Sequence, residues 1–405
     1  MSAPEFSVLL PTRNRVELLA QAIATVRAQD EASWEIVVSD NASVDDVRGL
    51  VKSIDDPRIR YLRTDTPLAV TDNWNRAADA ATGRWVVMLG DDDGLLPGYM
   101  RRMREACAAL AEPDLIYHGA YHFMAPGVVG PSQTRGLVSD VTQVYCMLHG
   151  RDAPVIIPPD EARAAARAAL DMRALYAFNM QHFLFRRDFL ERLRADAPVF
   201  RGPFPDFYTA NLALLLATRV GVVPRPMTVI GITPKSYGYF HLNDSEAAGM
   251  DFLGNQDFRD EVAPELRKRL LPGSYMNTLW LVSVALVRDA LPDDPSLLLG
   301  VGRYRRLQVV STILHHYTTG RPVGTTLGQM WPQLNRSERA LAMLLRLTLL
   351  PWRALPQFLR RVLAHLVASR FGQYGWLTRP RRVPLAPSNM LDAVDGLRRL
   401  AEGAA

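Results

Sequence analysis

The chain has 405 residues, of which 22% are charged and 48% are hydrophobic, and this composition is ordinary for a globular protein of two or three domains. Its two cysteines, Cys107 and Cys146, exclude a disulfide framework. The N-terminus has no basic region followed by an apolar core, and no uninterrupted apolar run reaches the ~20 residues that span a bilayer, so we expect a cytoplasmic protein.

The N-terminal part of the chain alternates between short apolar runs and segments with helical spacing. The apolar runs predict strands over Phe6–Leu10, Trp34–Val38, Ile59–Leu62 and Trp85–Leu89. The helical spacing predicts helices over Val16–Arg27, Val44–Ile54 and Asp72–Ala81. Strands that alternate with helices of this length predict an α/β fold with a Rossmann-like, mostly parallel sheet and helices on both faces.

The middle of the chain mixes the two patterns, and the rest is helical. Further strands are predicted over Leu115–Tyr117, Phe183–Phe185 and Met227–Ile232, and further helices over Glu161–Leu170 and Phe207–Ala217. From about Pro264 onward the pattern is helical, so we expect an α-helical region after the sheet.

The basic character of the chain is concentrated near its C-terminus. Residues 339–391 contain nine arginines and neither aspartate nor glutamate, whereas the whole chain has a net charge of +5. Two helices are predicted here, the second after Pro356, with apolar side chains on one face and Arg360, Arg361 and His365 on the other. Such helices are typical of the membrane interface, but the pattern also fits a helical pair that packs on the rest of the chain or on a partner.

Three adjacent aspartates, Asp91, Asp92 and Asp93, follow the strand predicted over Trp85–Leu89. The polar tips after the first and second strands lie at equivalent ends of the predicted sheet. Parallel sheets bind ligands beyond the carboxyl ends of their strands, so we expect these groups to converge on one rim. Three carboxylates in a turn favour a hard divalent cation, Mg²⁺ or Mn²⁺, which leaves positions open for substrate phosphates. The alternative is a solvated acidic turn.

The turn after the first strand lacks the glycine pattern of dinucleotide-binding folds, and no Walker-type loop is present. The chain resembles instead the family 2 glycosyltransferases with the GT-A fold, over about residues 5–240. The order and spacing of four segments carry this resemblance: Phe6–Asn14, Glu35–Ser43, Asn73–Arg76 and Ala81–Asp93. The resemblance implies inverting transfer of a sugar from a nucleotide donor, usually a uridine diphosphate sugar.

The resemblance also implies a set of donor-binding residues. These are Pro11, Thr12, Arg13, Asp40, Asn73, Arg76 and Asp91. Many relatives have an acid at the position of Gly90, so the metal carboxylate here is Asp92 or Asp93, of which we favour Asp92. Alternation after the last strand puts Lys235 and His241 on one side, where His241 would complete the metal ligands or reach the diphosphate; the alternative is a structural histidine, which is the more common role. Lys235 is placed near the diphosphate, and His182 near the acceptor or the diphosphate.

Relatives carry a catalytic base at the start of a helix well after the acidic turn. Asp206 has that position, just after Pro205 and before the helix predicted from Phe207. Its alternative role is a helix N-cap, which is common for aspartate. Asp188 is the second candidate, although Arg186 and Arg187 beside it suggest a structural ion pair.

The predicted organisation is a GT-A domain over residues 1–240, a helical extension over 241–337 and a basic amphipathic tail over 338–405. The predicted activity is inverting, metal-dependent transfer of a sugar to a hydroxyl of a cell-surface polysaccharide, glycolipid or lipid-linked acceptor at the inner face of the cell membrane. Residues 339–382 would provide the membrane contact. The sequence is compatible with a monomer and with a homo-oligomer. No nucleic-acid partner is expected, because no known binding module is present. The alternatives are a nucleotidyltransferase and a non-catalytic, membrane-associated assembly protein with a degenerate donor site.

Overall fold

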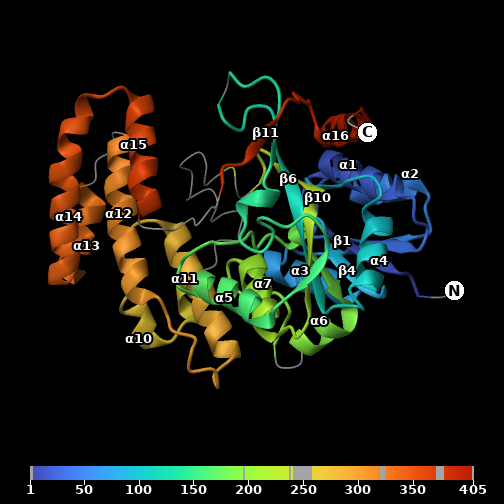
Figure 1. The fold of residues 1–405 in the computed structure, drawn as a ribbon, viewed down its shortest axis with the longest axis horizontal. Helices are drawn as coiled ribbons and strands as arrows, with labels where there is room; N and C mark the ends of the chain where they lie inside the picture. Colours follow the sequence, from blue (N-terminus) through green and yellow to red (C-terminus); the bar gives the residue numbers. More distant parts are fainter. Residues whose placement is uncertain are drawn as a thin grey trace.

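The N-terminal part of the chain folds as alternating strands and helices, seen here in a computed structural model (Figure 1). The structure describes residues 3–130, 132–194, 197–236, 239, 258–319, 324–370 and 378–403. The first elements are β1 (Phe6–Thr12), α1 (Val16–Arg27), β2 (Trp34–Asp40), α2 (Val47–Ile54), β3 (Ile59–Arg63), α3 (Val70–Asp79), β4 (Trp85–Met88), β5 (Gly94–Leu95) and α4 (Tyr99–Ala109). Helix α2 begins later than predicted, because the Asp46 side chain caps it by accepting a hydrogen bond from the Gly49 N–H at 2.8 Å.

Four of these strands form the parallel half of a mixed sheet, in the order β4-β1-β2-β3. The predicted α/β class with a mostly parallel central sheet and flanking helices is therefore confirmed. Because β1, β2 and β4 run in the same direction, their carboxyl ends lie at one edge. The polar residues that follow these strands are thus brought to the same rim, as the sequence predicts.

Side chains alternate between the two faces of this sheet, and each face has its own apolar core. Val8 and Leu10 of β1 pack with α1 and α4 on one face. Leu9 points to the other face, where α3 and α7 contribute to the core. Burial on both faces explains why β1, β2 and β4 read as apolar runs.

The second half of the sheet is mixed in direction. Its strands are β6 (Leu115–Met124), β7 (Leu137–Asp140), β8 (Val155–Ile157), β9 (Phe183–Arg186) and β10 (Val220–Ile232). Strand β9 lies antiparallel between β4 and β6, and β10 runs parallel to β6. Both β6 and β10 are longer than predicted. The helices of this half are α5 (Pro159–Leu170), α6 (Arg187–Leu193) and α7 (Pro205–Leu216).

The next part of the chain is helical, as predicted. Its helices are α10 (Pro264–Arg267), α11 (Tyr275–Ala290), α12 (Val301–Thr319), α13 (Gly324–Met330), α14 (Arg336–Leu349) and α15 (Gln357–Arg370). Helix α11 packs on α7 and joins the core of the sheet. Helices α12 to α15 share a separate apolar core and stand to one side of the sheet (Figure 1). Within the described part of the chain, we find no helix of the length and apolarity that crossing a membrane requires.

The C-terminal residues return to the sheet, which differs from the single tail predicted over 338–405. Strand β11 (Arg381–Val383) pairs antiparallel with β7, and α16 (Met390–Gly403) packs against α1 and β5. Figure 1 shows this red segment beside α1. The helical pair α14–α15 and the last residues therefore lie in different places.

Candidate active site

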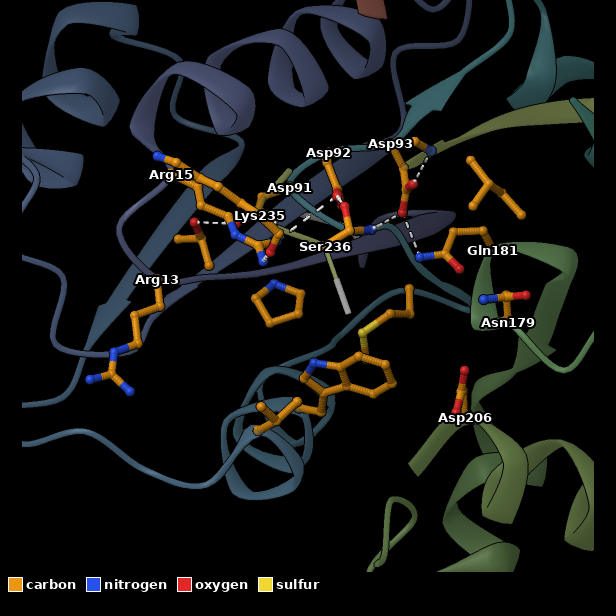
Figure 2. Close-up of a pocket in the computed structure, with 18 of the residues that line it drawn as sticks. Arg13, Arg15, Asp91, Asp92, Asp93, Asn179, Gln181, Asp206, Lys235 and Ser236 are labelled. Atoms are coloured by element: carbon orange, nitrogen blue, oxygen red, sulfur yellow. Dashed lines mark hydrogen bonds and ion pairs between the residues drawn. The ribbon is translucent and has the colours of Figure 1, made fainter. Parts of the chain in front are cut away.

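A cavity of about 870 Å³ opens at the carboxyl ends of β1 and β4. It is bounded by the turn after β1, the acidic turn after β4, the start of α3, the end of β10 and the start of α7. Nine of the residues predicted for the site line it: Pro11, Thr12, Arg13, Asn73, Asp91, Asp92, Asp93, Asp206 and Lys235. Figure 2 shows the acidic turn on one side of this cavity and Asp206 on the other.

Asp91 is held by groups at the end of β1. Its Oδ2 accepts a hydrogen bond from the Thr12 hydroxyl at 2.7 Å, and its Oδ1 lies 2.9 Å from the Arg15 guanidinium. Burial raises the pKa of Asp91, and Arg15 opposes that rise. Burial also lowers the pKa of Arg15, but Asp91 and then Asp92 outweigh this effect and leave it above its ordinary value. An ion pair therefore joins the first strand to the acidic turn.

Asp93 is fully engaged on the opposite side of the turn. Its Oδ2 accepts from the Gly90 N–H at 2.8 Å and from the Gln181 amide, and its Oδ1 accepts from the Gly231 N–H at 2.8 Å. Burial, and then the charge of Asp92, raise the pKa of Asp93 well above its ordinary value. Asp93 thus has a structural role, because its hydrogen bonds hold the acidic turn against β10.

Within the part of the chain that the structure describes, Asp92 is the member of the triplet that accepts hydrogen bonds at one carboxylate oxygen only. Its Oδ2 accepts hydrogen bonds from the Ser236 hydroxyl and, at 3.4 Å, from the Thr233 hydroxyl. Its Oδ1 accepts no hydrogen bond from the residues that the structure describes. The backbone here is tightly packed, since a Cβ on Gly231 would lie 1.9 Å from the Asp92 carbonyl oxygen.

The donor set of Asp92 fits a magnesium or manganese ion. Such ions take carboxylate oxygens, and Mg²⁺ is commonly held by one or two carboxylates together with substrate phosphates and water. No cluster of three or more metal-ligating side chains occurs among the described residues. A cation at Asp92 would accordingly take its other ligands from the donor and from solvent. His241 lies outside the described residues.

Two basic side chains stand beside the acidic turn. The Arg15 guanidinium lies 4.0 Å from Asp92 and donates to the Lys235 carbonyl, and the Lys235 ammonium donates to the Asn14 carbonyl at 3.2 Å. Figure 2 shows both side chains at the same wall of the cavity. Sequence reasoning selected Lys235 but not Arg15. The signal was present, since Arg15 follows β1 at the predicted ligand-binding rim.

Asp206 lies at the start of α7 but does not cap it. The N-cap is Phe204, with Pro205 in the first turn, so the N-cap interpretation of Asp206 is wrong. The Asp206 carboxylate accepts one hydrogen bond, from the neighbouring Phe207 N–H at 2.8 Å. Burial raises the pKa of Asp206 to about 6. A carboxylate with a pKa near neutrality suits general-base catalysis.

Asn179 and Gln181 also line the cavity, although they were not predicted from the sequence. Figure 2 shows Asn179 on the side of Asp206 and Gln181 beside Asp93. The second candidate base, Asp188, is not among the lining residues. Its side chain is 58% exposed and pairs with Arg186 at 2.6 Å. The structural ion pair suggested by the sequence is therefore present.

Three predicted residues lie outside the cavity lining: Asp40, Arg76 and His182. Asp40 is fully buried, and it accepts hydrogen bonds from the Ser43 N–H, the Tyr61 hydroxyl and the Arg63 guanidinium. Although burial alone would raise its pKa, the Ser43 and Tyr61 hydrogen bonds lower it. Both of its oxygens are occupied, so in this arrangement Asp40 organises the end of β2.

Arg76 and His182 are also engaged with the protein. Arg76 donates to the Ser39 hydroxyl and to the Arg63 carbonyl. His182 is fully buried with its Nδ1 2.7 Å from the His118 carbonyl oxygen, and burial lowers its pKa to about 3. His182 is thus neutral and faces the interior. Another histidine, His122, lines the cavity.

Residues 7–132 match the family model "Glycosyl transferase family 2". GalNAc(5)-diNAcBac-PP-undecaprenol beta-1,3-glucosyltransferase of Campylobacter jejuni is 39% identical over 105 residues, which are 25% of this chain and 34% of that protein. Succinoglycan biosynthesis protein ExoO of Rhizobium meliloti is 33% identical over 106 residues, or 26% of this chain and 30% of that protein. The matches thus span about a third of these curated relatives.

Among solved structures, the crystal structure of S. aureus TarS 1-349 is similar, with a TM-score of 0.45 and 13% identity. The similarity covers 85% of this chain and 92% of that chain. The resemblance to family 2 glycosyltransferases that the sequence motifs indicate is confirmed over residues 7–132.

Proposed function

We propose that this chain, whose residues 7–132 match glycosyl transferase family 2, is an inverting glycosyltransferase that uses a nucleoside diphosphate sugar and a divalent cation. The single observation that carries the proposal is the cavity itself. It unites Asp206, a half-buried acid whose pKa is raised to about 6, with an acidic turn in which one carboxylate oxygen accepts no hydrogen bond from the described residues.

In the proposed reaction, the Asp206 carboxylate accepts the proton of the acceptor hydroxyl. The oxygen of that hydroxyl forms a bond to the anomeric carbon as the bond from that carbon to the donor phosphate oxygen breaks. The leaving nucleoside diphosphate keeps the electron pair of the broken bond. Attack from the side opposite the leaving group inverts the configuration, which is why base and diphosphate are assigned to opposite sides of the cavity.

Negative charge develops on the leaving diphosphate, and positive groups in the cavity wall would stabilise it. Arg15 and Lys235 supply two fixed cationic side chains next to Asp92. A Mg²⁺ or Mn²⁺ ion held by Asp92 would act as a Lewis acid on the same oxygens. Asp91 and Asp93 hold the turn in place through Arg15, Gly90 and Gly231.

The donor in this proposal is a uridine diphosphate sugar, and Pro11, Thr12, Arg13 and Asn73 would line its pocket. The acceptor is a hydroxyl of a saccharide or of a lipid-linked saccharide. This class is supported by the names of the relatives, one of which acts on an undecaprenyl diphosphate acceptor and another in succinoglycan biosynthesis. A lipid-linked acceptor would place the reaction at the inner face of the cell membrane.

Calorimetric titration of the protein with uridine diphosphate sugars, with Mn²⁺ and with EDTA, tests the proposal. Asp92→Asn removes the charge that would hold the cation, so its affinity for donor in Mn²⁺ should fall about tenfold or more. In EDTA, wild type and Asp92→Asn should bind donor alike. Asp188→Asn, an exposed acid outside the cavity, is the matched control and should bind as wild type does. Undiminished Mn²⁺-dependent binding by Asp92→Asn would refute the assignment.

A further inference from the structure

Helix α14 carries apolar side chains on the side away from its core. Ala342, Leu345 and Leu349 are buried in the core that α14 shares with α12. Leu344 and Leu347, in contrast, are 58% and 71% exposed. Residues three or four apart lie on one side of a helix, so these exposed side chains form a stripe rather than scattered positions.

Helix α15 and the turn before it continue this pattern. Phe358 is 73% exposed, Leu359 and Val362 are each 42% exposed, and Leu350 in the connecting 3₁₀ turn (Leu350–Ala354) is 54% exposed. The apolar hairpin surface is defined here as residues Met343, Leu344, Leu347, Leu350, Phe358, Leu359 and Val362. Helices α14 and α15 both pack on α12, and the turn that joins them packs on α14. Several exposed apolar side chains on one such helical unit indicate an interaction site, whereas single ones do not.

The charged side chains around this surface indicate which kind of partner it binds. Arg346 and Arg353 are exposed in the same hairpin, and no acid occurs between residues 339 and 391. A second copy of the chain that presented the same face would bring arginines against arginines without a balancing carboxylate. An anionic surface complements both the arginines and the apolar side chains.

The length of the helices indicates how they would contact a bilayer. Helices α14 and α15 have 14 residues each, fewer than the ~20 that span a bilayer, and one side of each is already buried against α12. Their free sides are therefore suited to lie in the plane of a bilayer interface. Apolar side chains would enter the acyl boundary while arginines remain among the headgroups.

We propose that the apolar hairpin surface binds the anionic phospholipid surface of a bilayer. The binding does not depend on the proposed sugar transfer, because the surface lies on the helical part of the chain and shares no residue with the cavity. Vesicle binding can be measured without donor or acceptor, so the failure of either proposal is distinguishable from the failure of the other.

The test is flotation of the full chain with vesicles of phosphatidylglycerol and phosphatidylcholine, and with vesicles of phosphatidylcholine alone. Wild type should float with the anionic vesicles and be released by high salt, which screens charge. The double variant Leu347→Asp, Phe358→Asp should partition at least tenfold less. The matched control, Val44→Asp with Leu298→Asp, changes side chains that are 89% and 77% exposed elsewhere, and should partition as wild type does.

Three results would overturn the proposal. One is wild-type protein that stays with the soluble fraction when anionic vesicles float. Another is equal partitioning of the double variant and wild type. The third is a concentration-dependent dimer in analytical ultracentrifugation that the double variant abolishes while vesicle binding is absent, since the surface would then join two copies of the chain. Circular dichroism establishes that each variant is folded.

Discussion

The pKa of Asp206 predicts how the rate of sugar transfer depends on pH. Its pKa is raised to about 6 because burial disfavours the charged carboxylate. A general base must be ionised to accept a proton, so transfer should be slow at pH 5, rise through pH 6 and level off above pH 7. Initial rates measured across this range at saturating donor would show the rise. A rate that is flat between pH 5 and pH 7 would remove Asp206 from the proton transfer.

The raised pKa of Asp206 also predicts that ionisation of this carboxyl lowers the stability of the folded protein. The folded protein binds the Asp206 proton more tightly than the unfolded chain, whose ordinary aspartate pKa is near 4. The stabilisation is complete below about pH 4 and is lost as the pH rises through 6. Two pKa units correspond to at most about 3 kcal/mol, so Asp206→Asn should raise the thermal midpoint at pH 8. Asp188→Asn is the control, and an unchanged midpoint for Asp206→Asn would contradict the shift.

Most of the residues that line the cavity can be predicted from the sequence, but the different roles of the three aspartates cannot. Asp91, Asp92 and Asp93 are adjacent in sequence, yet they bond to β1, to the segment after β10 and to the Gly231 backbone respectively. The position of Arg15 after β1 indicates the ligand-binding rim, but no local pattern predicts its pairing with Asp91, which is 76 residues away. The same holds for Gln181 and Asp93, which are 88 residues apart.

Helix α16 links the C-terminus to the acidic turn. Met390 is buried against the paired strands β5 and β10, where a Cβ on Gly94 would lie 3.1 Å from its Sδ. Met390→Ala should lower the free energy of unfolding by about 2–5 kcal/mol, because it leaves a cavity. Leu400→Ala on the same helix is the control, since Leu400 is 42% exposed and its loss should cost under about 0.5 kcal/mol. Urea unfolding measures both, and equal costs would contradict this packing.

The elements differ in how well the sequence predicts them. Strands β1, β2 and β4 were found because burial on both faces leaves apolar runs such as Trp85–Leu89. Strand β11 was missed, since it has three residues and exists through pairing with β7, more than 200 residues earlier. The predicted start of β10 was late, because Pro224 and Pro226 interrupt the pattern at a register shift.

The described residues form four apolar cores. Two meet at the sheet, a third belongs to the helices α12 to α15, and a smaller fourth joins α16 and β11 to β6, β7 and β10. The cavity belongs to the sheet, whereas the apolar hairpin surface belongs to the helical part (Figure 1). This separation predicts that substitutions in the hairpin alter membrane binding while donor affinity in solution stays unchanged.

In the proposed reaction, one cavity holds both the donor diphosphate and the base that activates the attacking hydroxyl. The most direct test is release of nucleoside diphosphate from the best-bound nucleotide sugar in Mn²⁺, with water as acceptor, by wild type, Asp206→Asn and Asp188→Asn. We expect Asp206→Asn to lower kcat by about 10²–10⁴ with donor affinity nearly unchanged, while Asp188→Asn matches wild type. Near-normal turnover by Asp206→Asn, or no release by wild type, would contradict the proposed reaction.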